Sequence, residues 1–91
     1  MGIGLLYVTH PNEADAELLC ESLLNEKLIS CANFFQIKSM YNWEKNIIKE
    51  NETVSLMKFD KTKIEEVEKR IKELHSYEVP CIMRIPANRL A

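Results

Sequence analysis

The sequence predicts an α+β protein of the ferredoxin-like, split βαβ type, in which two helices cover one face of an antiparallel sheet. Two observations predict this fold class. Segments with strand and helix periodicity follow one another in the order strand, helix, strand hairpin, strand, helix, strand. The chain has 91 residues, of which 46% are hydrophobic and 29% charged, so it suits one folded domain over residues 1–91.

The first strand and the first helix meet at Pro11. Residues 3–9 are an apolar run typical of a buried strand, and proline ends such a run because it cannot donate to a strand ladder. Asn12 is a good N-cap for the helix that follows. Apolar residues then recur at helical spacing to about Lys27, at positions Ala16, Leu19, Cys20, Leu23 and Leu24.

A long strand with two apolar faces is predicted from Ile29 to Trp43. One face would carry Cys31, Asn33, Phe35, Ile37, Ser39, Tyr41 and Trp43, and the other Ala32, Phe34, Gln36, Lys38, Met40 and Asn42. A single layer of helices covers one face of a sheet, and a small monomer rarely leaves so much aromatic surface in water. The second face therefore predicts a partner subunit.

The chain is expected to return as an extended hairpin. Glu44-Lys45-Asn46 supplies the predicted turn, in which Asn46 is able to take a left-handed conformation. The returning chain is predicted in two pieces, a short strand over residues 47–50 and a second strand over residues 52–59, with a corner at Asn51.

The second helix has the strongest pattern in the chain. Thr62-Lys63-Ile64-Glu65 fits a capping box, and an apolar stripe follows it at Ile64, Val67, Ile71 and Leu74. His75 stands where a cation complements the C-terminal end of a helix. Residues 81–85 are the last predicted strand, and residues 87–91 are too few to form a further element.

Composition excludes several classes of protein. The net charge is −2 with interleaved signs, which gives no electrostatic reason to bind nucleic acid. Gly2 and Gly4 are the glycines of the sequence, so there is no Gly-rich phosphate loop. No apolar run is long enough to span a membrane, and no secretory signal is evident. Cys20, Cys31 and Cys81 form no paired motif, which favours reduced thiols in the cytoplasm.

Residues 74–82 hold the densest group of chemically able side chains. His75, Tyr77, Glu78 and Cys81 lie within seven residues, and imidazole and thiolate suit copper or zinc. The spacing matches no established metal motif. The structural alternatives are a hydrogen-bonding histidine at a helix end, a solvated loop acid, and a cysteine that acts as a small half-buried hydrophobe.

An enzymatic function has weaker support than a metal or ligand site, and the chain is not expected to be an enzyme. Cys31 or Cys81 with His75 offers a nucleophile and a base, but no oxyanion hole is recognisable. An acylphosphatase-like reaction would need an arginine in the loop after the first strand, where Thr9-His10-Pro11 stands. His10 could meet an anion at the helix N-terminus, although a solvated turn residue is the simpler interpretation.

Five motifs together carry a resemblance to a known family. They are Pro11-Asn12-Glu13, residues 27–33, Tyr41-Asn42-Trp43, Lys58 and residues 75–80. Each motif is ordinary alone, but in this order and spacing they are specific. Over nearly its whole length the chain resembles the CutA-type divalent-cation tolerance proteins.

The resemblance implies a ferredoxin-like homotrimer similar in architecture to the PII signalling proteins. It also implies a cleft between subunits, with the matching residues Cys31, Asn33, Trp43, Lys58, His75 and Tyr77. The family is associated with tolerance to copper and other divalent cations, and no enzymatic reaction is established for it.

The chain departs from the family pattern in four places. A copper site in a bacterial member uses one cysteine and two adjacent histidines, and the matching positions here are Val8 and Leu74-His75. Cys81 replaces a usual glutamate, and Lys45-Asn46 replaces a hairpin glycine. The family's C-terminal segment is expected to be missing.

The sequence therefore predicts a cytoplasmic homotrimer that binds copper or another divalent cation, with no nucleic-acid or membrane partner. His75 and Cys81 are the predicted metal ligands, with Cys31 as an alternative thiol. The predicted cleft residues are Cys31, Asn33, Trp43, Lys58 and Tyr77. The alternative is a PII-like signalling or scaffolding trimer that binds a small metabolite or a partner in its intersubunit clefts.

Overall fold

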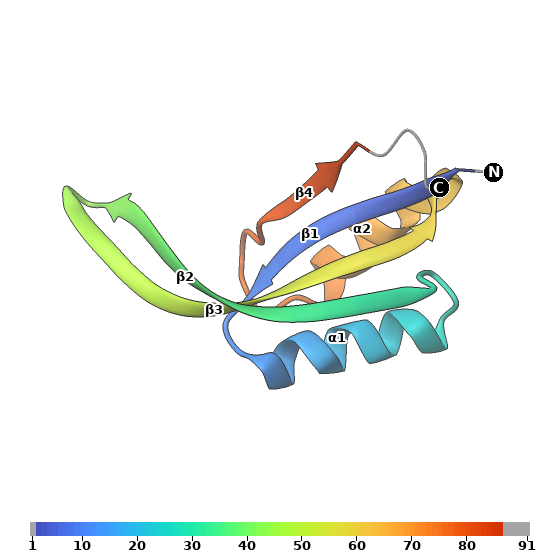
Figure 1. Cartoon of the computed structure of the whole chain (residues 1–91), viewed down its shortest axis with the longest axis horizontal. Helices are drawn as coiled ribbons and strands as arrows, with labels where there is room; N and C mark the ends of the chain where they lie inside the picture. Colours follow the sequence, from blue (N-terminus) through green and yellow to red (C-terminus); the bar gives the residue numbers. More distant parts are fainter. Residues whose placement is uncertain (1, 87–91) are drawn as a thin grey trace.

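The computed structural model describes residues 2–86, which form a four-stranded antiparallel sheet and two helices (Figure 1). The strand order is β2-β3-β1-β4. This order is the split βαβ arrangement, so the predicted fold class is confirmed. In chain order the elements are β1 (Ile3–His10), α1 (Glu13–Asn25), β2 (Cys31–Trp43), β3 (Asn46–Asp60), the 3₁₀ turn η1 (Lys61–Lys63), α2 (Ile64–Leu74) and β4 (Ile82–Ile85).

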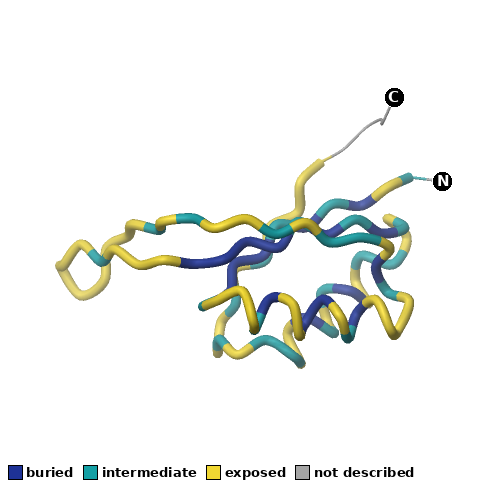
Figure 2. The backbone as a smooth tube through the Cα atoms, turned by 60° about the horizontal axis from the view of Figure 1, so that its bottom comes forward, coloured by how far each residue is buried: buried dark blue, intermediate teal, exposed yellow. Residues whose placement is uncertain are grey.

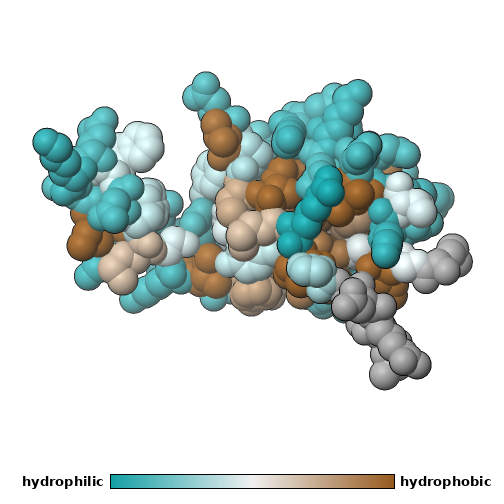
Figure 3. Space-filling view, turned by 90° about the horizontal axis from the view of Figure 1, so that it is seen from above, coloured by the Kyte–Doolittle hydropathy of each residue, from teal (hydrophilic) through white to brown (hydrophobic). Residues whose placement is uncertain are grey.

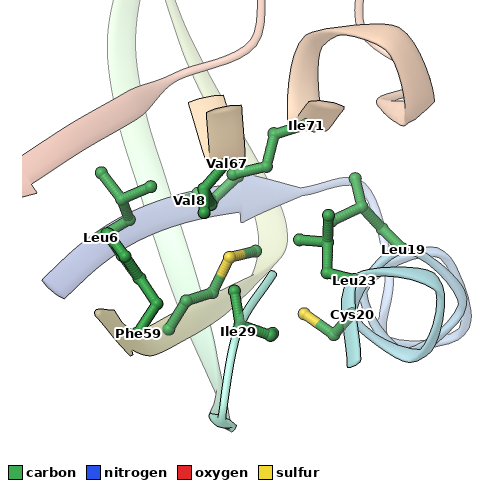
Figure 4. Close-up of a cluster of buried hydrophobic side chains, with 10 residues drawn as sticks. Leu6, Val8, Leu19, Cys20, Leu23, Ile29, Phe59, Val67 and Ile71 are labelled. Atoms are coloured by element: carbon green, nitrogen blue, oxygen red, sulfur yellow. The ribbon is translucent and has the colours of Figure 1, made fainter. Parts of the chain in front are cut away.

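Both helices cover the same face of the sheet, and the core lies between the two layers (Figure 2). Alternate residues of β1 and β3 point into this core because side chains alternate across a strand. The core side chains are at most 5% exposed, and burial of each aliphatic, phenylalanine or methionine side chain among them stabilises the fold by about 1.5–3 kcal/mol. Figure 4 shows the cluster, which consists of Leu6, Val8, Leu19, Cys20, Leu23, Ile29, Met57, Phe59, Val67 and Ile71.

The start of α1 agrees with the prediction, but its end comes earlier. The Asn12 side chain accepts a hydrogen bond from the Asp15 amide at 2.8 Å, which is the expected N-cap. The helix ends at Asn25 rather than near Lys27. Lys27 has a left-handed φ of 60°, and the Leu28 amide donates back to the Leu23 carbonyl at 2.9 Å.

The hairpin forms an arm that projects beyond the helices (Figure 1). β3 runs without a break through Asn51, which pairs with Lys38, so the predicted corner was wrong. Every residue of β3 has a partner on β2 or β1, and this pairing outweighs the weak strand propensity of asparagine and glutamate. Glu44 and Lys45, rather than Asn46, take the left-handed conformations of the two-residue turn.

The start of α2 also differs from the prediction. Thr62 lies in η1, where its amide and hydroxyl both donate to the Asp60 carboxylate, at 3.0 and 2.8 Å. The N-cap of α2 is Lys63, which makes no side-chain cap bond, so the predicted capping box does not form. The predicted stripe does enter the core, where Val67 and Ile71 are buried.

The sheet face opposite the helices is open within one chain. Alternate residues of β2, β3, β1 and β4 line this open face, including Phe35 (44% exposed), Trp43 (62%) and Met83 (49%). Figure 3, seen from above, shows apolar side chains gathered over the body of the molecule and others near the hairpin tip. As to membranes, neither described helix has the length and apolar character of a bilayer span.

Candidate functional site

The loop after α2 folds back onto the end of β1, and His75 holds it there. The His75 amide ends the helix by donating to the Ile71 carbonyl at 2.8 Å. His75 Nε2 lies 2.7 Å from the Thr9 carbonyl oxygen, and His75 Nδ1 lies 3.0 Å from the Tyr77 amide nitrogen. A carbonyl only accepts and an amide N–H only donates. The geometry therefore fits a ring with its proton on Nε2 and its Nδ1 lone pair engaged.

This geometry leaves His75 without a free lone pair for a metal. Cys81 is exposed, and its carbonyl accepts a hydrogen bond from the Thr9 amide at 3.4 Å, so Thr9 holds both predicted ligands in place. Within residues 2–86, no three side chains of histidine, cysteine, aspartate or glutamate come together as a metal site. Among these described residues, His75 and Cys81 are therefore not joined by a third side chain of this kind.

Tyr77 reaches across the open face to Glu52, a residue that sequence reasoning missed. The Tyr77 hydroxyl donates to Glu52 Oε2 at 2.7 Å, and Glu52 is 8% exposed. Burial, and then the hydrogen bond to Glu52, raise the pKa of Tyr77 above its usual value. Glu50 lies two positions before Glu52 on the same face of β3, and its carboxylate accepts a hydrogen bond from the Tyr41 hydroxyl at 3.1 Å. The two acids thus each have a phenol partner.

A second group of predicted residues meets where β2 begins. Cys31 is opposite Lys58 in the ladder between β2 and β3. Cys31 Sγ contacts Asn33 Oδ1 at 4.0 Å, and the Ser30 amide and hydroxyl both bind the Lys58 carbonyl, at 2.9 and 3.1 Å. The structure therefore brings Cys31, Asn33 and Lys58 together.

One chain does not bring all of the predicted cleft residues together. Lys58 and Glu52, the partner of Tyr77, are six positions apart on β3, or about 20 Å at the usual rise of a strand. Trp43 is opposite Asn46, about another 20 Å towards the hairpin tip. The described residues therefore form three separate groups: Cys31/Asn33/Lys58 and Trp43 on the open face, and His75/Tyr77/Glu52 near the end of β1.

His10 is buried, contrary to the interpretation from the sequence. It was interpreted as a solvated turn residue, yet it is 1% exposed and is the last residue of β1. Its ring stacks on His75 with centroids 5.0 Å apart, and its Nε2 lies 2.7 Å from Ser55 Oγ. Burial first, and proximity to His75 second, lower the pKa of His10 to about 4. The alternation Leu6, Val8, His10 was the sequence signal that could have placed it inside.

Fold and site together define a small ferredoxin-like protein with polar and aromatic side chains on its open sheet face. The chain belongs to the CutA1 divalent ion tolerance protein family, whose model matches residues 4–91. That family is defined by tolerance of divalent ions and is not a known enzyme class.

Individual relatives agree with this assignment. The divalent-cation tolerance protein CutA of Pyrococcus horikoshii is 41% identical over 81 residues, which are 89% of this chain and 79% of the relative. The structure of the Archaeoglobus fulgidus CutA protein, described as periplasmic, has a TM-score of 0.92 at 37% identity and covers 99% of this chain and 88% of its own. The structure of a PII-like CutA protein from Nostoc sp. has a TM-score of 0.86 at 28% identity, and the match covers 93% of this chain and 81% of the Nostoc chain.

Proposed function

We propose that this protein serves divalent-cation homeostasis as a cytoplasmic homotrimer that binds its ligand in clefts between subunits. It acts by binding, without turnover. The observation that carries the proposal is the separation of the three groups by about 20 Å along β3. In the proposed trimer, a neighbouring copy of the chain forms the second wall of each cleft.

The apolar side chains of the open face support the trimer. Phe35, Trp43, Met83 and Ile85 are 37–62% exposed in one chain, and the arm that carries Trp43 extends beyond the helices. Large exposed apolar patches mark interaction surfaces. In the proposed assembly the arm of one copy lies over the open face of the next and brings Trp43 to one of the other two groups.

The geometry supports a small metabolite or a peptide partner as the ligand of this cleft. Both ring nitrogens of His75 are already hydrogen-bonded, so His75 positions Tyr77 and the loop. Lys58 supplies a cation, Asn33 an amide and Trp43 a stacking surface, which together suit an organic ligand. The divalent-cation phenotype of the family would then arise through signalling, as in the PII-like alternative.

Direct binding of copper or another divalent cation is the second candidate function, and one observation favours it. Thr9 holds the Cys81 backbone through its amide and the His75 ring through its carbonyl. A thiolate and an imidazole are ligands that copper accepts. Coordination at His75 Nδ1 requires the bond from the Tyr77 amide to open.

Calorimetric titration separates the two candidates. Copper(II) and zinc are titrated into the wild-type protein, His75→Ala, Cys81→Ser and Cys31→Ser, the last of which tests the alternative thiol. Direct coordination by His75 and Cys81 predicts at least a tenfold loss of affinity in His75→Ala and Cys81→Ser, whereas a loss in Cys31→Ser instead of Cys81→Ser assigns the thiol ligand to Cys31. Equal affinity in wild type and His75→Ala removes His75 from any metal site.

The cleft proposal has its own test. A thermal-shift screen of anions, nucleotides and metals finds ligands, because a ligand that binds the folded state raises the melting temperature. A cleft ligand should lose its shift in Lys58→Ala and Trp43→Ala, while Lys61→Ala, outside the three groups, keeps it. A ligand whose shift survives both cleft variants contradicts the proposed site.

A further inference from the structure

A cavity on the helix side of the sheet lies apart from the open face. It has a volume of about 360 Å³ and is lined by His10, Asp15, Leu18, Leu19, Ser22, Leu74 and Ser76. The walls come from the end of β1, from α1 and from the end of α2. None of these residues belongs to the three groups of the proposed cleft, except that His10 stacks on His75.

His10 is a buried residue with one ring nitrogen left over at this cavity. The side chain is 1% exposed, and its Nε2 is engaged with Ser55 Oγ at 2.7 Å. Among the described residues, Nδ1 has no hydrogen-bond partner. A serine hydroxyl has two lone pairs as well as a proton, so Ser55 Oγ can accept the proton of His10 Nε2. This arrangement leaves a lone pair on Nδ1, at the cavity wall.

The other polar wall groups are acceptors as well. The Ser22 hydroxyl donates its proton to the Leu18 carbonyl at 3.2 Å, and the Ser76 hydroxyl donates to Asp15 Oδ2 at 3.3 Å. Both serine oxygens therefore keep lone pairs and have no proton to offer. The Asp15 carboxylate adds a negative charge and further lone pairs. The wall thus has several acceptors and one anionic group.

The remaining wall is hydrocarbon from three leucines, Leu18, Leu19 and Leu74. We propose that this cavity binds a small primary alkylammonium ion, with the ammonium group on Asp15 and His10 Nδ1 and the alkyl chain on the leucines. An ammonium group has three donors and no acceptor, which matches this wall. The volume is at the lower end of the range for ligand pockets, so the alkyl chain must be short.

The test uses the whole chain and butylammonium as the probe. Amide and imidazole nitrogen NMR spectra are followed during the titration. Saturating shifts are expected at Leu18, Leu74 and the His10 ring, and Asp15→Asn should weaken binding at least tenfold. Glu17→Gln, a neighbouring exposed acid of α1 outside the cavity wall, is the matched control and should bind like wild type. Melting curves check that both variants remain folded.

Two ligand controls make the result decisive. Butyrate and butanol carry a similar alkyl chain without the ammonium group, and neither should bind comparably. Equal binding by either, unchanged affinity in Asp15→Asn, or a proton on His10 Nδ1 in the ligand-free protein would overturn the proposal. Zinc shifts at these residues without amine binding would also overturn it. Because the cavity lies within one chain, the result is independent of whether the protein is a trimer.

Discussion

At the scale of single residues, His75 organises the loop after α2 through both ring nitrogens. His75→Ala removes the bonds to the Thr9 carbonyl and the Tyr77 amide, and it leaves two backbone groups to find new partners. We expect the free energy of unfolding to fall by about 1–3 kcal/mol. Urea denaturation measures this loss, with Tyr77→Phe as a control that removes only the bond to Glu52. A His75→Ala protein as stable as wild type would contradict the geometry.

The buried His10 ring makes stability depend on pH. Its pKa is about 4 in the folded protein and 6.5 in the reference state, so the unfolded chain binds more protons between these values. The stabilisation is present above pH 6.5 and is lost as the pH falls from 6.5 to about 4. The full loss is about 3 kcal/mol. Denaturation curves at several pH values should show a flatter pH dependence in His10→Gln than in wild type over this interval.

The site residues that sequence reasoning missed share one physical feature. Glu52 and His10 were missed as site residues because the partners of their hydrogen bonds are distant in the sequence. Glu52 meets Tyr77 across 25 positions, and His10 meets Ser55 across 45. Local chemistry does identify able side chains such as His75, but the hydrogen bonds that occupy its nitrogens arise only when the loop folds onto β1.

At the scale of elements, the hairpin turn carries identifiable strain. Lys45 has a φ of 67°, a conformation that a side chain with a Cβ atom disfavours and glycine accepts. Lys45→Gly should therefore raise the free energy of unfolding by about 0.5–1 kcal/mol. Asn46→Gly, at a strand position without a left-handed φ, should lower it. Thermal denaturation of the two variants gives the comparison, and equal effects would contradict the assigned turn.

The elements themselves were predictable to different degrees. Both helices and the apolar faces of the strands followed from periodicity, as the buried Leu23 and Ile71 confirm. The corner at Asn51 was wrong because strand pairing with Lys38 is a tertiary effect. The Thr62 capping box failed because Asp60, two residues earlier, accepts both Thr62 donors. Local patterns thus predict the type of an element better than its ends.

At the scale of the whole molecule, the shape is elongated. The extents are 45 × 26 × 21 Å and the radius of gyration is 13.7 Å, compared with about 12 Å for a compact domain of this length. The projecting arm of β2 and β3 accounts for the difference (Figure 1). A single chain therefore holds much of its apolar surface away from its own core.

The proposed trimer gives a direct prediction about mass. Light scattering should give three times the chain mass of 10.6 kDa. Phe35→Lys places a charge on the open face and should lower the measured mass towards one chain, because a desolvated charge without a partner opposes association. Leu18→Lys, on a 68% exposed residue of α1, is the control and should keep the wild-type mass. A wild-type monomer would refute the trimer.

The arm of β2 and β3 has a further consequence. β1 pairs with β3 from Thr53 onwards, so before that residue the arm is a two-stranded ribbon whose backbone is open along both edges. Isolated ribbons of this kind are marginally stable in water, and open edges invite pairing with another chain. The tip should therefore be more ordered when the chains are associated. Because association increases with protein concentration, the tip should become more ordered at high concentration and less ordered on dilution. The protein concentration itself becomes a variable that sets how well Trp43 is positioned.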